Sequence, residues 1–175
     1  RRVLFRSVVK LARDEGSFHF IRECTPAARV VVGDARLSLA REANQAFDVL
    51  IMDAFSSDSI PTHLMTREAL SLLRTKLAPG GVILFNISNR YLRLEPVVAN
   101  TARAAGLLGI AQVYQATPRQ QGELVTSSHW IALSVDAAAL ERIAETGNWH
   151  NLRPDPTSNV WTADYSSLLG VLSLK

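Results

Sequence analysis

The chain has 175 residues, of which 47% are hydrophobic and 20% are charged, as in an ordinary soluble globular domain. No uncharged apolar run approaches the ~20 residues that span a bilayer, and the start lacks the order of a signal peptide. The single cysteine, Cys24, excludes an internal disulfide framework and any multi-cysteine metal site. We therefore expect one soluble domain in a reducing compartment such as the cytoplasm, with no membrane contact by this segment.

The net charge of +3 is local to the start of the chain. Arg1, Arg2 and Arg6 lie in a stretch without acids, and the remaining residues balance to neutrality. Residues 1–7 also resemble the translation of a sequencing-adapter oligonucleotide, so we expect a scar there and the domain over residues 8–175. Because the rest has neither a basic stripe nor basic runs interleaved with aromatics, nucleic acid is not an expected partner.

The first expected elements are the tail of a helix, a strand and a short helix. Residues 8–13 have helical apolar spacing and end near a glycine. Arg29–Val32 is a β-branched run closed by Gly33 and Asp34, which is typical of a buried strand with an acid at its carboxyl end. A short helix is predicted over residues 37–43.

The clearest strand of the chain is Phe47–Asp53. Its continuous apolar run suits a parallel strand that is covered on both faces, and it also ends in an aspartate. A serine-rich loop follows over residues 54–61. A helix is then predicted over residues 66–77, with Thr66 as its N-cap.

The remaining elements continue the alternation of strands and helices. They are a buried strand over 82–87 after a Pro-Gly-Gly break, a helix over 95–105, two strands over 110–114 and 130–135 that pair as an antiparallel hairpin, and a helix over 136–146 capped by Asp136. This order predicts an α/β fold with a mostly parallel sheet and an antiparallel edge hairpin. In such sheets ligands bind outside the carboxyl ends of the strands, where Asp34 and Asp53 fall.

Each of these two acids has two possible roles. The carboxylate of Asp34 could accept a hydrogen bond from an adenine amino group, with Gly33 permitting close approach, or it could cap the following helix. The two roles do not exclude each other. Asp53, beside a serine-rich loop, could be a general base or a cation site, or it could simply form a turn.

A resemblance to a known family rests on the stretch from Phe47 to Leu64, followed by Leu77–Gly81 and Phe85–Tyr91. These segments resemble the spermidine synthase-like proteins, the polyamine aminopropyltransferase family, and above all its bacterial branch that is often fused to membrane segments. Trp161–Leu169 also resembles that branch. The resemblance covers nearly everything after Ser7 and implies a class I methyltransferase-like, that is Rossmann-like, fold.

The resemblance implies transfer of an aminopropyl group from decarboxylated S-adenosylmethionine to a diamine such as putrescine, without a metal. It implies that Asp34, with Gly33 and Ala35 beside it, binds the nucleoside part of this co-substrate. It also implies that Asp53, the first acid of the family's Asp-x-x-Asp motif, takes a proton from the attacking amine. A protonated amine has no lone pair, so a carboxylate must accept its proton before displacement.

The chain departs from the family pattern in two places. The family's second acid falls on Ser56, and the next aspartate is Asp58, so both are candidates for binding the amine, together with Tyr91 after a later strand. The family's glycine-rich motif and ribose-binding acid should precede Val8. We therefore expect a fragment that lacks the first, central strand of its sheet, and it is open whether this fragment is active by itself.

Weaker candidates and alternatives remain. His63 and the loop residues Gln120, Gln121 and Glu123 are more often structural than functional. His19, His129 and His150 occur singly and predict no metal cluster.

Two other functions stay open. They are an S-adenosylmethionine-dependent methyltransferase of the same fold, because fold does not decide function, and a non-catalytic nucleoside-binding module. Family members are often dimers, so a homodimer is one expectation for the assembly. The intact protein is another open point, because the resembling branch often carries membrane segments.

Overall fold

The structure is a computed structural model that describes residues 9–12, 23–24, 27–53, 61–89 and 91–172. It divides into two compact units, Arg1–Arg41 and Glu42–Lys175, and each is described by itself. The expected scar over residues 1–7 lies outside the described residues, and the expected single domain over residues 8–175 stays a prediction.

In the first unit, some of the described residues form short helical pieces. Residues 9–12 are helical, and helix α3 (Ala35–Ala40) begins two residues before the predicted start. The expected strand over Arg29–Val32 is wrong, because these residues are not assigned to a strand and Val31 is 55% exposed. A strand is held by hydrogen bonds to a neighbouring strand, and the strand pairings among the described residues do not include this segment.

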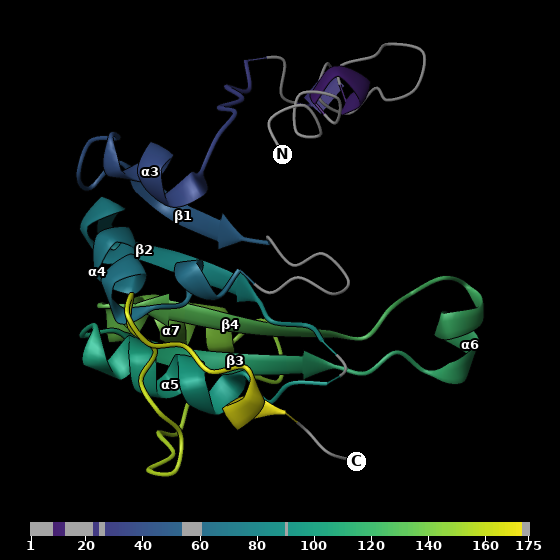
Figure 1. The fold of residues 1–175 in the computed structure, drawn as a ribbon. Coiled ribbons are helices and arrows are strands. Elements are labelled where there is room, and N and C mark those ends of the chain that lie inside the picture. Colours follow the sequence, from purple (N-terminus) through teal and green to yellow (C-terminus); the bar gives the residue numbers. More distant parts are fainter. Residues whose placement is uncertain (1–8, 13–22, 25–26, 54–60, 90, 173–175) are drawn as a thin grey trace. The chain divides into compact units, whose positions relative to one another are not determined.

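The second unit contains a five-stranded mixed sheet in the order β1-β2-β4-β3-β5 (Figure 1). The strands are β1 (Phe47–Met52), β2 (Leu77–Asn86), β3 (Leu108–Tyr114), β4 (Ser128–Ser134) and β5 (His150–Asn151). β1 and β2 are parallel neighbours, and every other neighbouring pair is antiparallel. β1, β2 and β3 therefore run in one direction, and the expected antiparallel hairpin, formed by β3 and β4, is confirmed.

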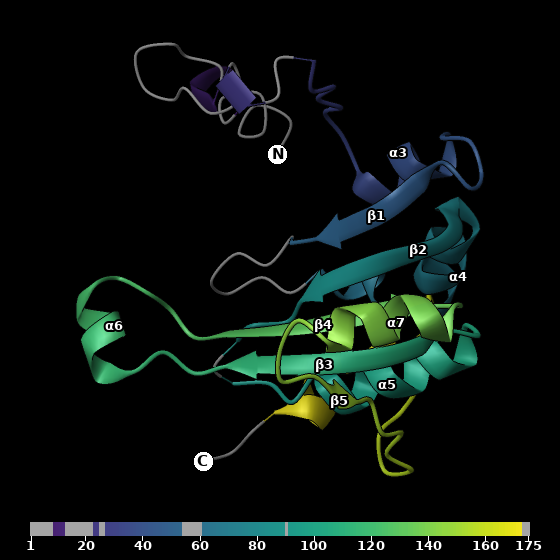
Figure 2. The same ribbon diagram turned by 180° about the vertical axis from the view of Figure 1, so that it is seen from behind.

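Helices cover both faces of this sheet. Helices α4 (Arg67–Lys76) and α5 (Glu95–Ala104) lie on one face, and α7 (Ala137–Ala144) lies on the other (Figures 1 and 2). The predicted caps are confirmed: Thr66 Oγ1 accepts from Ala69 N at 3.2 Å, and Asp136 Oδ1 accepts from Ala138 N at 3.0 Å. In the described part of the chain, no helix is both long and apolar enough to pass through a bilayer.

Shorter helical turns connect these elements. They are η1 (Thr62–Leu64) before α4, α6 (Pro118–Gly122) in the β3–β4 hairpin, and η2 (Leu169–Val171) near the carboxyl terminus. Helix α6 lies in a loop that the sequence predicts only as polar. Its capping box, formed by Thr117 and Gln120, shows why this loop becomes helical.

Strand β1 is less covered than its composition suggests. Val49 is 52% exposed and Ile51 is 62% exposed, so the prediction of a strand covered on both faces is wrong for this structure. These side chains are exposed because β1 is an edge strand of the sheet. The helices of this unit pack mainly on β2, β3 and β4.

A bulge in β2 sets the alignment of the two parallel strands. The register shifts between Phe47 and Val49, opposite the Pro-Gly-Gly segment that precedes Val82. Gly80 has a φ of +75°, and a Cβ on Gly81 would lie 2.9 Å from the carbonyl oxygen of Phe47. Beyond the bulge the register runs without a break to the carboxyl ends of both strands.

The carboxyl-terminal segment packs on the α4–α5 layer, where it follows the helices in Figure 1. Trp161 is 1% exposed, its carbonyl oxygen accepts from Arg67 N at 2.8 Å, and its N–H donates to Thr101 Oγ1 at 3.2 Å. A segment that the sequence leaves without assigned structure therefore supplies one of the largest side chains of the core.

Candidate functional site

Asp53 lies directly after β1, at the end of the sheet where the sequence predicts a ligand site. Its Oδ1 accepts a hydrogen bond from Nδ2 of Asn86, the last residue of β2, at 2.9 Å. The parallel register brings the two residues level, since Met52 is opposite Phe85. The predicted position of Asp53 at a strand end is thus confirmed, and its role as a base stays a prediction.

The side-chain oxygen of Asn86, at the opposite end of the amide group from Nδ2, is held by Ser88. Asn86 Oδ1 accepts from the N–H of Ser88 at 3.0 Å and from the Ser88 hydroxyl at 2.6 Å. The Ser88 Oγ in turn accepts from the N–H of His129, the second residue of β4, at 2.8 Å. Asn86 and Ser88 are not among the predicted site residues, although a polar residue at the end of an otherwise apolar strand and another just beyond it are a signal that could have identified them.

Two histidines that look isolated in the sequence meet at one carboxylate. His129 Nε2 lies 3.0 Å from Glu95 Oε2, in an ion-pair contact without hydrogen-bond geometry, and His150 Nε2 lies 2.9 Å from Glu95 Oε1. His129 is opposite Val113 and His150 is opposite Ala111 on β3, so the sheet places both histidines on one face. No group of three or more possible ligands among the described residues has an arrangement that would hold a metal ion.

These two imidazoles change the acidity of Glu95. The contact with His129, and then the one with His150, hold the pKa of Glu95 below its usual value, although partial burial acts in the opposite direction. Glu95 is also in the first turn of α5, where a negative charge is favourable.

We expect the Glu95→Gln variant to lose part of the acid dependence of stability. A carboxyl group whose pKa is lower in the folded state stabilises the protein above its unfolded-state pKa, here about 4.5, and this contribution disappears as the pH falls through the folded value. The contribution is about 1 kcal/mol or less, because the pair is partly solvated. Urea unfolding between neutral and acidic pH measures it, with the exposed Glu141→Gln as control. Identical pH dependence in the wild type and in Glu95→Gln would contradict this expectation.

The candidate nucleoside-binding residues lie in the first unit. Asp34 is the N-cap of α3, since its Oδ1 accepts from Leu37 N at 2.9 Å, so its capping role is confirmed. Gly33 has a φ of +153°, a conformation that disfavours any residue with a Cβ, and Ala35 opens the helix. Their contact with a nucleoside stays a prediction.

The candidate amine-binding residues are only partly described. Ser56 and Asp58 lie outside the described residues. Tyr91 is 66% exposed, and its N–H donates to Asn89 Oδ1 at 3.1 Å. A role of Tyr91 at an amine pocket therefore stays a prediction.

The weaker candidates of the β3–β4 hairpin serve local structure. Gln120 closes the capping box with Thr117, Gln121 Nε2 donates to Ala116 O at 2.9 Å, and Glu123 pairs with Arg119 at 3.2 Å. This agrees with the structural interpretation of these residues. His63 is exposed on η1.

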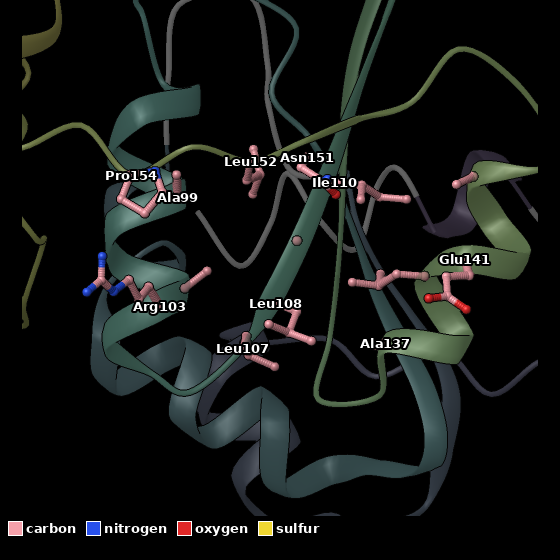
Figure 3. Close-up of a pocket in the computed structure, with 14 residues that line it drawn as sticks. Ala99, Arg103, Leu107, Leu108, Ile110, Ala137, Glu141, Asn151, Leu152 and Pro154 are labelled. Atoms are coloured by element: carbon pink, nitrogen blue, oxygen red, sulfur yellow. The ribbon is translucent and has the colours of Figure 1, made fainter.

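A separate cavity of about 370 Å³ lies beside the start of β3 and is lined by residues of β3, α5 and α7 (Figure 3). Its lining is mostly apolar and includes Leu107, Leu108 and Leu140, with Arg103 and Glu141 as its charged residues. Leu108 begins β3, so the cavity is at the opposite end of the sheet from Asp53.

Comparisons with known proteins give one relative of matching sequence and several of matching fold. No protein-family model matches the chain. A polyamine aminopropyltransferase from Vibrio vulnificus (strain CMCP6) is 42% identical over 60 residues, which are 33% of this chain and 20% of that protein. The chain therefore spans about a fifth of the length of this curated relative.

The structural neighbours include two spermidine synthases. A probable spermidine synthase from Corynebacterium glutamicum has a TM-score of 0.56 at 16% identity, over 90% of this chain and 63% of that one. The spermidine synthase from Thermotoga maritima has a TM-score of 0.49 at 15% identity, over 85% of this chain and 50% of that one. The first of these shows that the chain has the predicted class I methyltransferase-like fold. The predicted resemblance to the polyamine aminopropyltransferases is confirmed by the relative of matching sequence, which is by its name a transferase.

Proposed function

We propose that this chain, like the polyamine aminopropyltransferases that it resembles, takes part in the transfer of an aminopropyl group from decarboxylated S-adenosylmethionine to a diamine such as putrescine. The observation that carries the proposal is the carboxylate of Asp53 at the carboxyl end of the sheet. Among the described residues, only Oδ1 of this carboxylate has a hydrogen-bond partner. In the proposal, the other oxygen, Oδ2, receives the amine.

In the proposed reaction, Asp53 first holds the ammonium group of the diamine and then accepts its proton at Oδ2. The freed nitrogen lone pair attacks the methylene carbon next to the sulfonium, so a nitrogen–carbon bond forms as the carbon–sulfur bond breaks. The electrons of the broken bond neutralise the sulfonium, and a thioether nucleoside leaves. Most of the acceleration comes from holding the two reactants in line, because the sulfonium is already a good leaving group.

The remaining residues of the proposal bind the adenine of the co-substrate and the second ammonium group of the diamine. Asp34, between Gly33 and Ala35, would accept from the adenine amino group while it caps α3. Asp58, Ser56 and Tyr91 would bind the second ammonium group of the diamine. The proposal also places the protein in the cytoplasm, with the intracellular co-substrate, and leaves a homodimer and the absence of nucleic-acid binding as predictions.

Titration calorimetry of the full natural protein tests the proposal. Decarboxylated S-adenosylmethionine and S-adenosylmethionine are titrated separately, and each titration is followed by putrescine. We expect tighter binding of the decarboxylated form and binding of putrescine in its presence. Preference for S-adenosylmethionine without putrescine binding would move the function to methyl transfer, and binding of neither would favour a non-catalytic module.

A further inference from the structure

We propose that Asn86 and Ser88 form a positioning pair that fixes the orientation of the Asp53 carboxylate. The inference rests on the proposed function, in which Asp53 is the general base. Neither residue is assigned a catalytic step, because each acts through the next group in a chain of hydrogen bonds that ends at Asp53.

The first step concerns the two ends of the Asn86 amide. Its oxygen is the acceptor end and its nitrogen is the donor end, and a rotation of the amide group exchanges them. Ser88 presents two donors to this amide, its N–H at 3.0 Å and its hydroxyl at 2.6 Å, and both reach Asn86 Oδ1. The donor end therefore faces Asp53, where Nδ2 donates to Oδ1 at 2.9 Å.

The reversed amide would be strongly disfavoured. It would place its NH₂ group against the N–H of Ser88, and its carbonyl oxygen against the carboxylate of Asp53. Each of these contacts would bring two donors or two acceptors together in place of a donor and an acceptor, and both hydrogen bonds would be lost. Ser88 thus selects the single amide orientation that can hold Asp53.

The second step concerns what holds Ser88. A hydroxyl has one proton, and here it is donated to Asn86, so its oxygen is free to accept the N–H of His129 at 2.8 Å. The neighbouring Ile87 also donates its N–H to the carbonyl oxygen of His129 at 2.8 Å. The orientation of the hydroxyl is therefore set by the backbone of β4, which is part of the sheet.

The consequence for the reaction is a carboxylate that is oriented but not neutralised. An amide donor holds Oδ1 without supplying a positive charge or a competing proton acceptor. Oδ2 then faces the amine in one direction, which matters because small displacements of a reacting group are costly in rate. A cationic partner at the same place would instead compete with the diamine for the carboxylate.

Steady-state kinetics of the full natural protein test the pair, with putrescine as the varied substrate. We expect Ser88→Ala to lower kcat roughly tenfold and Asn86→Ala to lower it by roughly ten- to a hundredfold, with little change in KM. Ser88→Thr keeps the hydroxyl and should retain most of the wild-type kcat. Because Ser88 acts only through Asn86, Ser88→Ala should have no further effect on kcat in the Asn86→Ala background.

Three results would overturn the positioning role. The first is an unchanged kcat in Ser88→Ala. The second is a double variant in which the losses of kcat of the two single substitutions multiply. The third is a Ser88→Thr variant whose kcat is as low as that of Ser88→Ala at equal thermal stability. If Asp53→Asn leaves turnover unchanged, Asp53 is not the general base and the positioning role fails with it, whereas a wild-type protein that forms no triamine would overturn the proposed function itself.

A spectroscopic measurement tests the pair even in a protein without measurable turnover. The side-chain NH₂ protons of Asn86 should shift in the NMR spectrum when acid protonates the carboxylate that they contact. This shift should persist in Ser88→Thr and disappear in Asp53→Asn. Its persistence in Asp53→Asn would show that Asn86 does not hold Asp53, and the inference would fail independently of the reaction.

Discussion

The Asp53→Asn variant is expected to lower turnover by roughly 10²–10⁴-fold, the range typical of the loss of a general base. An amide does not accept the proton that the attacking amine must lose, although it has nearly the size and shape of the carboxylate. Asp53 is exposed at a strand end, so the fold should tolerate the change. Steady-state rates with decarboxylated S-adenosylmethionine and putrescine give the result, and calorimetry should show that nucleoside binding persists.

Asp48→Asn is the matched control for this variant. Asp48 is an exposed acid near the opposite end of β1, so the same chemical change there should leave turnover within about twofold of the wild type. Equal losses for Asp48→Asn and Asp53→Asn would indicate a general effect of charge on binding. Unchanged turnover in Asp53→Asn would remove Asp53 from the mechanism.

The second large effect is expected for Trp161→Ala, which should lower the free energy of unfolding by about 3–5 kcal/mol. The indole is 1% exposed, and the backbone of the same residue ties the carboxyl-terminal segment to Arg67 and Thr101. Removing the side chain leaves a cavity between this segment and the helical layer. Urea unfolding with and without the substitution measures the loss.

Tyr165→Ala in the same segment is the control for Trp161→Ala. Tyr165 is 47% exposed, and its hydroxyl accepts only from Asn159 Nδ2 at 3.0 Å among the described residues. Its replacement should therefore cost about 1 kcal/mol. Equal and small losses for both variants would show that the carboxyl-terminal segment contributes little to the stability of the domain.

Much of the second unit can be predicted from local patterns. The strands around Leu50 and Ile83, the helix after Thr66 and the helix after Asp136 all follow from apolar spacing and capping residues. The wrong prediction at Arg29–Val32 has a different cause. A β-branched run favours an extended backbone, but a strand also needs a partner, which no local pattern can supply.

The candidate site was predictable only where a single residue carried the signal. Asp53 stands at the end of an apolar run, so its place at the ligand edge of the sheet follows from the sequence. Asn86 and His129 become part of the site through the pairing of β2 with β1 and β4, and this register depends on a bulge and on non-local contacts. Outside the site, the burial of Lys76 is also not predictable from the sequence. Lys76 is 4% exposed, and it donates at 2.8 Å to Oδ1 of Asn44, a residue far from it in the sequence.

The most direct test of aminopropyl transfer is mass spectrometry of the products formed by the full natural protein. It is incubated with decarboxylated S-adenosylmethionine and putrescine, and the amines and nucleosides are quantified over time. We expect a triamine, putrescine plus one aminopropyl group, and a thioether nucleoside in equal amounts, with both lost in Asp53→Asn. A methylated product with S-adenosylmethionine and no triamine under any condition would contradict the proposed function.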